Sequence, residues 1–231
     1  MKKQETNQRN PRREFIGTLA GSAALGITAV AAPLQALAGE EKQPDISDAD
    51  KWFNKITGKH RVVYDVPHPH EIFPFAWPRV FLITNQVTGS PEKDCSVVVV
   101  LRHDSIPYAF EDRLWEKYNF SQHFKAYIPM TETPTNKNPF WKPAEGTYKV
   151  PGFGVIQIGI NELQASGVMF CVCEAAITVH STIIAGKLGK PQEEVRKDWM
   201  TGLLPGIQPV PSGVWALGRA QEHKCAYIFA G

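Results

Sequence analysis

The sequence predicts an α/β domain with a largely parallel sheet of about five strands, on three observations. Short apolar runs alternate with helical patterns along residues 59–231. One of these runs, Cys95–Leu101 (CSVVVVL), is almost wholly β-branched, which is typical of a strand buried on both faces of a parallel sheet. No internal repeat and no Gly/Ser-rich linker interrupts the alternation, so we expect a single domain.

The strands are predicted from short apolar runs that turn signals separate. They are expected at His60–Val66, Cys95–Leu101, Val168–Cys173, Ile207–Val210 and Cys225–Phe229. The order of these strands in the sheet does not follow from the sequence. Their carboxyl ends do matter, because ligand sites in such sheets lie at that edge.

The helices between the strands are predicted from apolar spacing and from capping residues. They are expected around Asp48–Ile56, Trp77–Val87, 109–119, 156–166, Ala175–Lys187, Pro191–Leu203 and 212–223. Pro78 suits a first helical turn, Gly167 suits a helix end, and Ser212 is a typical N-cap. Residues 120–150 lack such periodicity and are expected to form a surface loop or flap. Its aromatic residues Phe140 and Trp141 are interpreted equally as an exposed cap on a pocket or interface and as ordinary packing.

The first residues of the chain resemble an export signal. Paired arginines at 12–13 precede an uncharged stretch over 15–39, rich in Gly and Ala, with an A-L-A triplet at 36–38. This pattern is typical of a cleaved signal, and the arginine pair followed by Phe-Ile resembles the twin-arginine type. A membrane anchor is the less favoured alternative. We therefore expect a signal at 1–38, cleavage near Ala38, a polar lead-in at 39–58, and a periplasmic protein without stable membrane insertion.

The composition and charge exclude several classes of protein. The chain has 231 residues, 43% of them hydrophobic, which is ordinary for a globular protein and excludes a disordered chain. The formal net charge is +2 and its basic excess lies in the leader, so the nearly neutral body argues against nucleic-acid binding. No G-x-G-x-x-G, Walker A or G-x-S-x-G motif occurs, which argues against dinucleotide, nucleotide and serine-hydrolase sites.

Cys173 is the first candidate for chemistry. It is expected where the third strand ends and a helix begins, so its thiol interacts with the positive end of the helix macrodipole, which favours the thiolate. The alternative is a buried structural cysteine. Glu174 follows directly and is a candidate binding residue, and an acid beside the thiol opposes thiolate formation. Cys171, two residues earlier in the strand, is expected on the same side as Cys173, as a core or resolving thiol.

Polar residues at other strand ends complete the predicted site. His103 is a candidate general base or thiolate partner, and Arg102 a candidate for stabilising an anionic sulfur species. His68 and Ser212 follow the first and fourth strands and are candidate binding residues. Together with Cys173, the histidines 68, 70, 103 and 180 also suggest a metal site, but no H-x-x-x-H or C-x-x-C spacing supports one. We expect no cofactor, with a metal as the less favoured alternative. Cys95 and Cys225 are expected to be packing residues at the opposite edge.

The body of the chain, over about 59–231, resembles the DsrE/DsrF-like family, which includes the TusD-type sulfur-relay proteins. The resemblance rests on these segments: VVVVLRH at 97–103, IPY at 106–108, LWEKY at 114–118, NPF at 138–140, GVMFCVC at 167–173, LPGIQ at 204–208, PSGV at 211–214 and CAYIFAG at 225–231. It implies a three-layer α/β/α, flavodoxin-like fold and a trimer or hexamer. It also implies a persulfide on Cys173, exchanged with a donor or acceptor protein. The sequence thus predicts a sulfur carrier or sulfurtransferase. The alternatives are a metal or small-ligand binding module and an oligomeric protein whose cysteines only pack.

Overall fold

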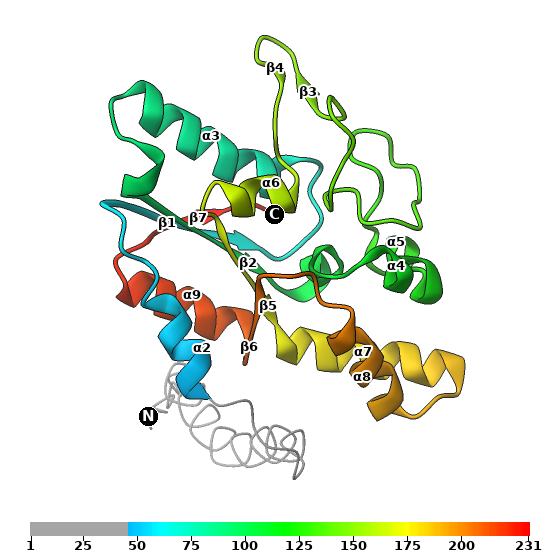
Figure 1. The fold of residues 1–231 in the computed structure, drawn as a ribbon. Coiled ribbons are helices and arrows are strands. Elements are labelled where there is room, and N and C mark those ends of the chain that lie inside the picture. Colours follow the sequence, from blue (N-terminus) through cyan, green and yellow to red (C-terminus); the bar gives the residue numbers. More distant parts are fainter. Residues whose placement is uncertain (1–45) are drawn as a thin grey trace, which may run out of the picture. The chain divides into compact units, whose positions relative to one another are not determined.

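A five-stranded sheet organises residues 46–231, the part of the chain that the computed structural model describes (Figure 1). The strands are β1 (His60–Val66), β2 (Cys95–Leu101), β5 (Met169–Cys173), β6 (Ile207–Val210) and β7 (Ala226–Phe229). All neighbouring strands pair in parallel, in the order β6-β5-β2-β1-β7. The predicted class, with about five mainly parallel strands, is confirmed.

The order of the strands places a switch point beside β1. From β1 the chain moves outward through β2 and β5 to β6, and then returns to place β7 on the other side of β1. This order differs from the 2-1-3-4-5 order of flavodoxin. In open α/β sheets, ligands bind outside the carboxyl ends of strands where the direction of winding reverses. The ends of β1 and β7, and of β2 next to them, are therefore the edge to search.

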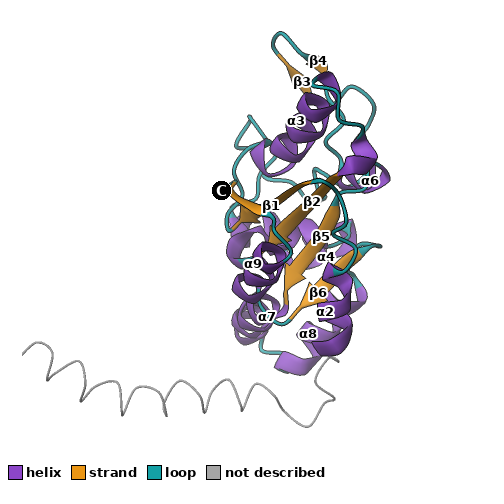
Figure 2. Ribbon diagram, turned by 90° about the vertical axis from the view of Figure 1, so that its left-hand side faces the viewer, coloured by secondary structure: helices purple, strands orange, loops and turns teal. Residues whose placement is uncertain are grey.

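Helices cover both faces of the sheet, which makes the fold three-layered (Figures 1 and 2). The helices are α2 (Ile46–Phe53), α3 (Phe73–Val87), α4 (Asp112–Tyr118), α5 (Phe120–Phe124), α6 (Ile160–Ala165), α7 (Glu174–Leu188), α8 (Gln192–Thr201) and α9 (Gly213–Glu222). Two 3-10 helices, η1 (Glu92–Asp94) and η2 (His103–Ala109), and a hairpin of β3 (Lys149–Val150) and β4 (Gly154–Val155) complete the elements. Helices α3 and α6 lie on one face, and α2 and α9 on the other (Figure 1).

Most predicted helix boundaries agree with the structure to within a few residues. The Ser212 hydroxyl accepts a hydrogen bond from the Trp215 N–H at 3.2 Å, as an N-cap does. Gly167 has a φ of +81°, a left-handed conformation that suits the turn between α6 and β5. The exception is α3, which begins at Phe73 rather than near residue 77. Pro74 occupies its first turn, and Pro78 lies buried inside the helix.

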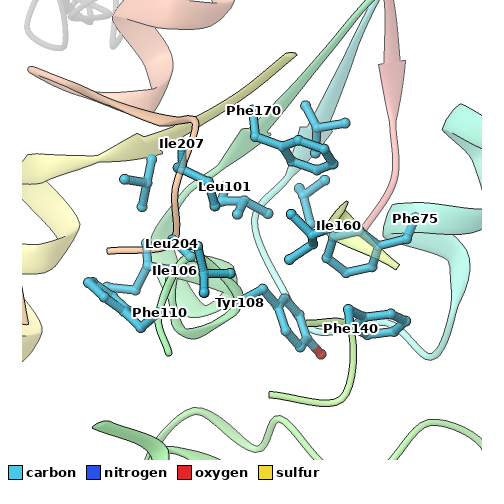
Figure 3. Packing of buried hydrophobic residues seen from close by; sticks show 14 of the residues in the cluster. Phe75, Leu101, Ile106, Tyr108, Phe110, Phe140, Ile160, Phe170, Leu204 and Ile207 are labelled. Atoms are coloured by element: carbon cyan, nitrogen blue, oxygen red, sulfur yellow. The ribbon is translucent and has the colours of Figure 1, made fainter. Parts of the chain in front are cut away.

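The larger part of the core lies between the sheet and the layer that contains α3 and α6. Figure 3 shows how Phe75, Tyr108 and Phe140 meet beside Leu101 and Phe170 in this core. Phe140 is fully buried, and its ring centroid lies 4.1 Å from that of Phe75. The interpretation of Phe140 as an exposed aromatic cap is therefore wrong. The side-chain amide of Asn138 donates to the Tyr108 and Phe110 carbonyls at 2.9 Å, which fastens this irregular segment to the core.

A smaller cluster fills the opposite face. Helix α2 contributes Trp52 and Phe53 to it, and α9 contributes Ala216 and Ala220. The folded unit therefore begins within the predicted lead-in, before residue 59. The predicted export signal at 1–38 lies outside the described residues. Within residues 46–231, no helix has the length and apolar character needed to cross a bilayer.

Candidate functional site

The loops that follow β1 and β2 lie side by side at the carboxyl edge of the sheet. The Arg102 N–H donates to the Val66 carbonyl at 3.1 Å, and the Asp104 N–H donates to the Pro67 carbonyl at 2.9 Å. His103 lies between these two bonds with a φ of +51°, a left-handed conformation that few non-glycine residues adopt. These contacts bring the side chains of His68, His103 and Asp104 to one place.

Three histidines face the Asp104 carboxylate. His68 Nδ1 lies 3.5 Å from Asp104 Oδ2, and His103 Nε2 lies 3.7 Å from the same oxygen. His180 Nε2, from α7, lies 3.5 Å from Asp104 Oδ1. The ligand atoms of His68, His103 and Asp104 all lie within 4.8 Å of one another. We call His68, His103, Asp104 and His180 the histidine cluster.

A fourth histidine, His123, contacts His180 of the histidine cluster. His123 Nε2, on α5, lies 3.1 Å from His180 Nδ1, within hydrogen-bond distance. Burial, with a smaller contribution from the neighbouring His180, lowers the pKa of His123 to about 4. Burial also lowers the pKa of His180, against the opposing effect of the Asp104 carboxylate. A hydrogen bond at this distance needs one ring to donate its N–H and the other ring to accept it.

Cys173 lies at the end of β5, where the sequence predicts it. It is the N-cap of α7, and its Sγ accepts a hydrogen bond from the Ala176 N–H at 3.3 Å. The residue is 6% exposed. The N-terminus of α9 lies next to that of α7, because the Ala175 N–H donates to the Pro211 carbonyl at 3.2 Å. Cys173 thus lies where two helices direct their positive ends.

Arg102 follows β2 at the same edge of the sheet as the thiol, and a buried acid holds its side chain. Its guanidinium donates to both carboxylate oxygens of Asp65, at 2.6 Å and 2.9 Å, and the Tyr227 hydroxyl donates to Asp65 at 2.7 Å. The hydrogen bond to Asp65 raises the pKa of Arg102, and the nearby Cys173 sulfur adds to that rise. Gly213 at the start of α9 leaves room for the Arg102 stem, since a Cβ there would lie 2.5 Å from Arg102 Cβ.

The other predicted site residues have structural partners. The Glu174 carboxylate accepts a hydrogen bond from Arg196 of α8 at 3.0 Å, which offsets its charge beside the thiol. Burial raises the pKa of Glu174 and Arg196 opposes the rise. Ser212 is engaged as the cap of α9. His70 packs against the Phe73 ring, outside the histidine cluster.

Cys171 and Cys173 contact different core clusters, although both are residues of β5 and Cys173 pairs with Val210. Cys171 is fully buried in the cluster beneath α2 and α9, whereas Cys173 joins the core on the opposite face. Burial raises the pKa of the Cys171 thiol far above its usual range. Cys171 is therefore a packing residue.

Sequence reasoning missed Asp65, His123 and Tyr227 and gave no role to Asp104. Asp65 had a usable signal, because a charged residue inside an otherwise apolar strand needs a partner when buried. Asp104 follows His103 at a strand end and shared the signal that selected His103. His123 and Tyr227 carried no local signal, since only the folded chain brings them to α7 and to β1.

Comparison with known proteins adds little to this geometry. No family model and no curated protein matches the chain. One solved structure, the protein of unknown function MTH1491 from Methanobacterium thermoautotrophicum, is 18% identical to it. The match covers 74% of this chain and 98% of that one, with a TM-score of 0.34. The resemblance to the DsrE/DsrF-like family, the export route and the trimer or hexamer therefore stay predictions.

Proposed function

We propose that the protein takes up sulfane sulfur as a persulfide on Cys173. The observation that carries the proposal is the position of the Cys173 sulfur as the N-cap of α7, where it accepts the Ala176 N–H. A helix N-terminus favours an anionic sulfur over a neutral thiol, and the thiolate is the reactive form. The predicted twin-arginine leader would place this uptake in the periplasm.

The surroundings of Cys173 also suit an anionic donor. The positive charge of Arg102 acts electrostatically on Cys173, and the N-termini of α7 and α9 are neighbours. Backbone N–H groups at helix N-termini bind anions, and the positive charge of Arg102, whose paired donors are held by Asp65, adds to the attraction for an anion. Thiosulfate and inorganic polysulfide are sulfur donors that carry such negative charge. The 6% exposure of Cys173 favours these small anions over the thiol of a partner protein as the first donor.

The uptake step balances without a redox cofactor. The Cys173 thiolate attacks the outer sulfur of thiosulfate and forms a new S–S bond. The S–S bond of the donor breaks, and sulfite leaves with the electron pair. Cys173 then carries a persulfide anion. A thiolate acceptor that attacks the outer sulfur takes it away and releases Cys173 as thiolate again.

Intact mass spectrometry with peptide mapping tests the proposal. The full chain is exposed to thiosulfate or polysulfide, with and without a reductant afterwards. We expect a gain of one sulfur on the Cys173 peptide that the reductant removes, which separates a persulfide from irreversible oxygen addition. Cys173→Ser should lose the gain and keep the fold, because serine is itself a good N-cap. Cys95→Ser, at the opposite edge of the sheet, is the matched control and should keep it. An unreactive Cys173 in a folded protein would overturn the proposal.

A further inference from the structure

We infer that the histidine cluster is a binding site for a divalent transition-metal ion, with His68, His103 and Asp104 as its first ligands. The inference does not depend on Cys173 chemistry, because the sulfur of Cys173 is not a member of the group of ligand atoms that lie within 4.8 Å of one another. It also departs from the expectation that no metal site is present, which rested on sequence spacing alone.

The spacing of the donor atoms suits a metal rather than direct hydrogen bonds. The three nitrogen-to-oxygen distances around Asp104 are 3.5, 3.7 and 3.5 Å, longer than the 2.7–3.2 Å that is usual for such bonds. Two ligands on a tetrahedral zinc ion lie roughly 3.3 Å apart, because each is about 2.0–2.1 Å from the metal. Small side-chain rotations would therefore place His68, His103 and Asp104 around one ion.

The donor set selects a class of metal. Imidazole nitrogens with one carboxylate oxygen suit zinc and other divalent first-row transition metals, whereas calcium and magnesium prefer all-oxygen sites. His180 Nε2 lies 3.5 Å from Asp104 Oδ1, so a third imidazole is within reach of the same ion. When His180 Nδ1–H donates to His123 Nε2, the lone pair of His180 Nε2 points away from that bond and is available as a further donor.

The side chains of the histidine cluster differ in their exposure to solvent. The side chains of His68 and His103 are 52% and 59% exposed, whereas that of His180 is 12% exposed. The metal would therefore be held from the protein side by Asp104 and His180 and would face solvent on the other side. Such an ion keeps an exchangeable position for water or a small anion, unlike a closed structural zinc site.

Cobalt titration of the untagged full chain tests the inference, after removal of metals with a chelator. We expect one Co²⁺ per chain, with an absorption spectrum of nitrogen and oxygen coordination, and displacement by Zn²⁺. Single variants His68→Ala, His103→Ala and Asp104→Asn should each weaken Co²⁺ binding by at least about tenfold. His70→Ala is the matched control, since this exposed histidine lies two residues from His68 but outside the cluster, and it should bind like wild type.

Three outcomes would overturn the inference. The first is no Co²⁺ or Zn²⁺ binding at micromolar concentrations. The second is binding that the His68 and Asp104 variants leave unchanged. The third is a thiolate-to-cobalt charge-transfer band, which would put a cysteine in the coordination shell. Cys173→Ser should bind Co²⁺ normally, and chelator-treated wild type without metal should still take up sulfur. The metal inference and the sulfur proposal can therefore fail separately.

Discussion

The two edges of the sheet hold the same kinds of residues and use them differently. At the carboxyl edge, three imidazoles face one carboxylate and a thiol faces a helix N-terminus. At the amino edge, His60 pairs with the Ser90 hydroxyl at 3.0 Å, and His223 stacks on Phe53. Cys225 there is buried, and burial raises its pKa to about 11. Histidines and cysteines form a candidate site at the carboxyl edge, whereas at the amino edge they take part in packing.

The difference lies in what the groups face. Within residues 46–231, Arg61 at the amino edge donates to two backbone carbonyls, those of Gly58 and His223. It therefore links the loop before β1 to the end of α9. Arg102 at the carboxyl edge is held by the buried Asp65 carboxylate and interacts electrostatically with Cys173. Titratable groups whose pKa is shifted by burial and by a specific charged partner are candidates for a functional site. The following predictions probe this contrast between the two edges, beginning with the largest expected effect.

Arg102→Ala should destabilise the protein by about 3 kcal/mol, because it leaves the buried Asp65 carboxylate with only the Tyr227 hydroxyl. Arg61→Ala at the amino edge should cost about 1 kcal/mol, since it removes neutral hydrogen bonds and leaves no buried charge. Urea unfolding measures both. Sulfur uptake on Cys173 should also fall in Arg102→Ala and not in Arg61→Ala. Equal destabilisation of the two variants would show that the edges do not differ in this respect.

Gly58→Ala should cost about 2 kcal/mol and leave the carboxyl edge unchanged. A Cβ at residue 58 would lie 2.6 Å from the Cys95 backbone carbon, which cannot move without shifting β2. Gly213→Ala should instead disturb Arg102, whose Cβ lies 2.5 Å from the new methyl position. We expect sulfur uptake to fall in Gly213→Ala and to persist in folded Gly58→Ala. Thermal unfolding measures the loss of stability, and the mass-spectrometric assay measures sulfur uptake. Equal sulfur uptake by the two variants would contradict the expected difference between the two edges.

The two cysteines of β5 should respond differently to serine. Cys171→Ser buries an unpartnered hydroxyl in the core, so we expect a loss of about 1.5 kcal/mol. Cys173→Ser should cost less than about 0.5 kcal/mol, because the serine oxygen accepts the same Ala176 N–H. Denaturant unfolding of both variants checks this order. The reverse order would make Cys173 the packing cysteine.

Much of the fold followed from local sequence signals. Strands such as Cys95–Leu101 and the Ser212 cap depend on residues close together in the chain, and the structure confirms them. The burial of Phe140 was harder to predict, because it depends on Phe75 and Tyr108, which lie far away in sequence. The order of the strands could not be predicted for the same reason, since β7 pairs with β1, which lies far away in sequence.

The candidate site was predictable to the extent that strand ends are predictable. The rule that ligands bind at the carboxyl edge selected His68, His103 and Cys173, and the structure places all three at that edge. It missed His123, which reaches His180 from a helix of five residues within the unpatterned segment. Asp65 was missed because its partners, Arg102 and Tyr227, come from two other strands or strand ends. Convergence of distant segments is the information that local patterns lack.

Acid should weaken the carboxyl edge through His123. Its pKa is about 4 in the folded protein, chiefly because of burial, and about 6.5 in an unfolded chain. Between these values the unfolded chain binds more protons, so the free energy of unfolding falls as the pH falls through this window. After allowance for solvent screening, we expect a loss of about 1 kcal/mol from about pH 7 to about pH 5. Urea unfolding of His123→Gln, in chelator, should show a smaller loss over this range. A slope that the variant leaves unchanged would place the acid sensitivity elsewhere, and the amino edge would then be the region to examine.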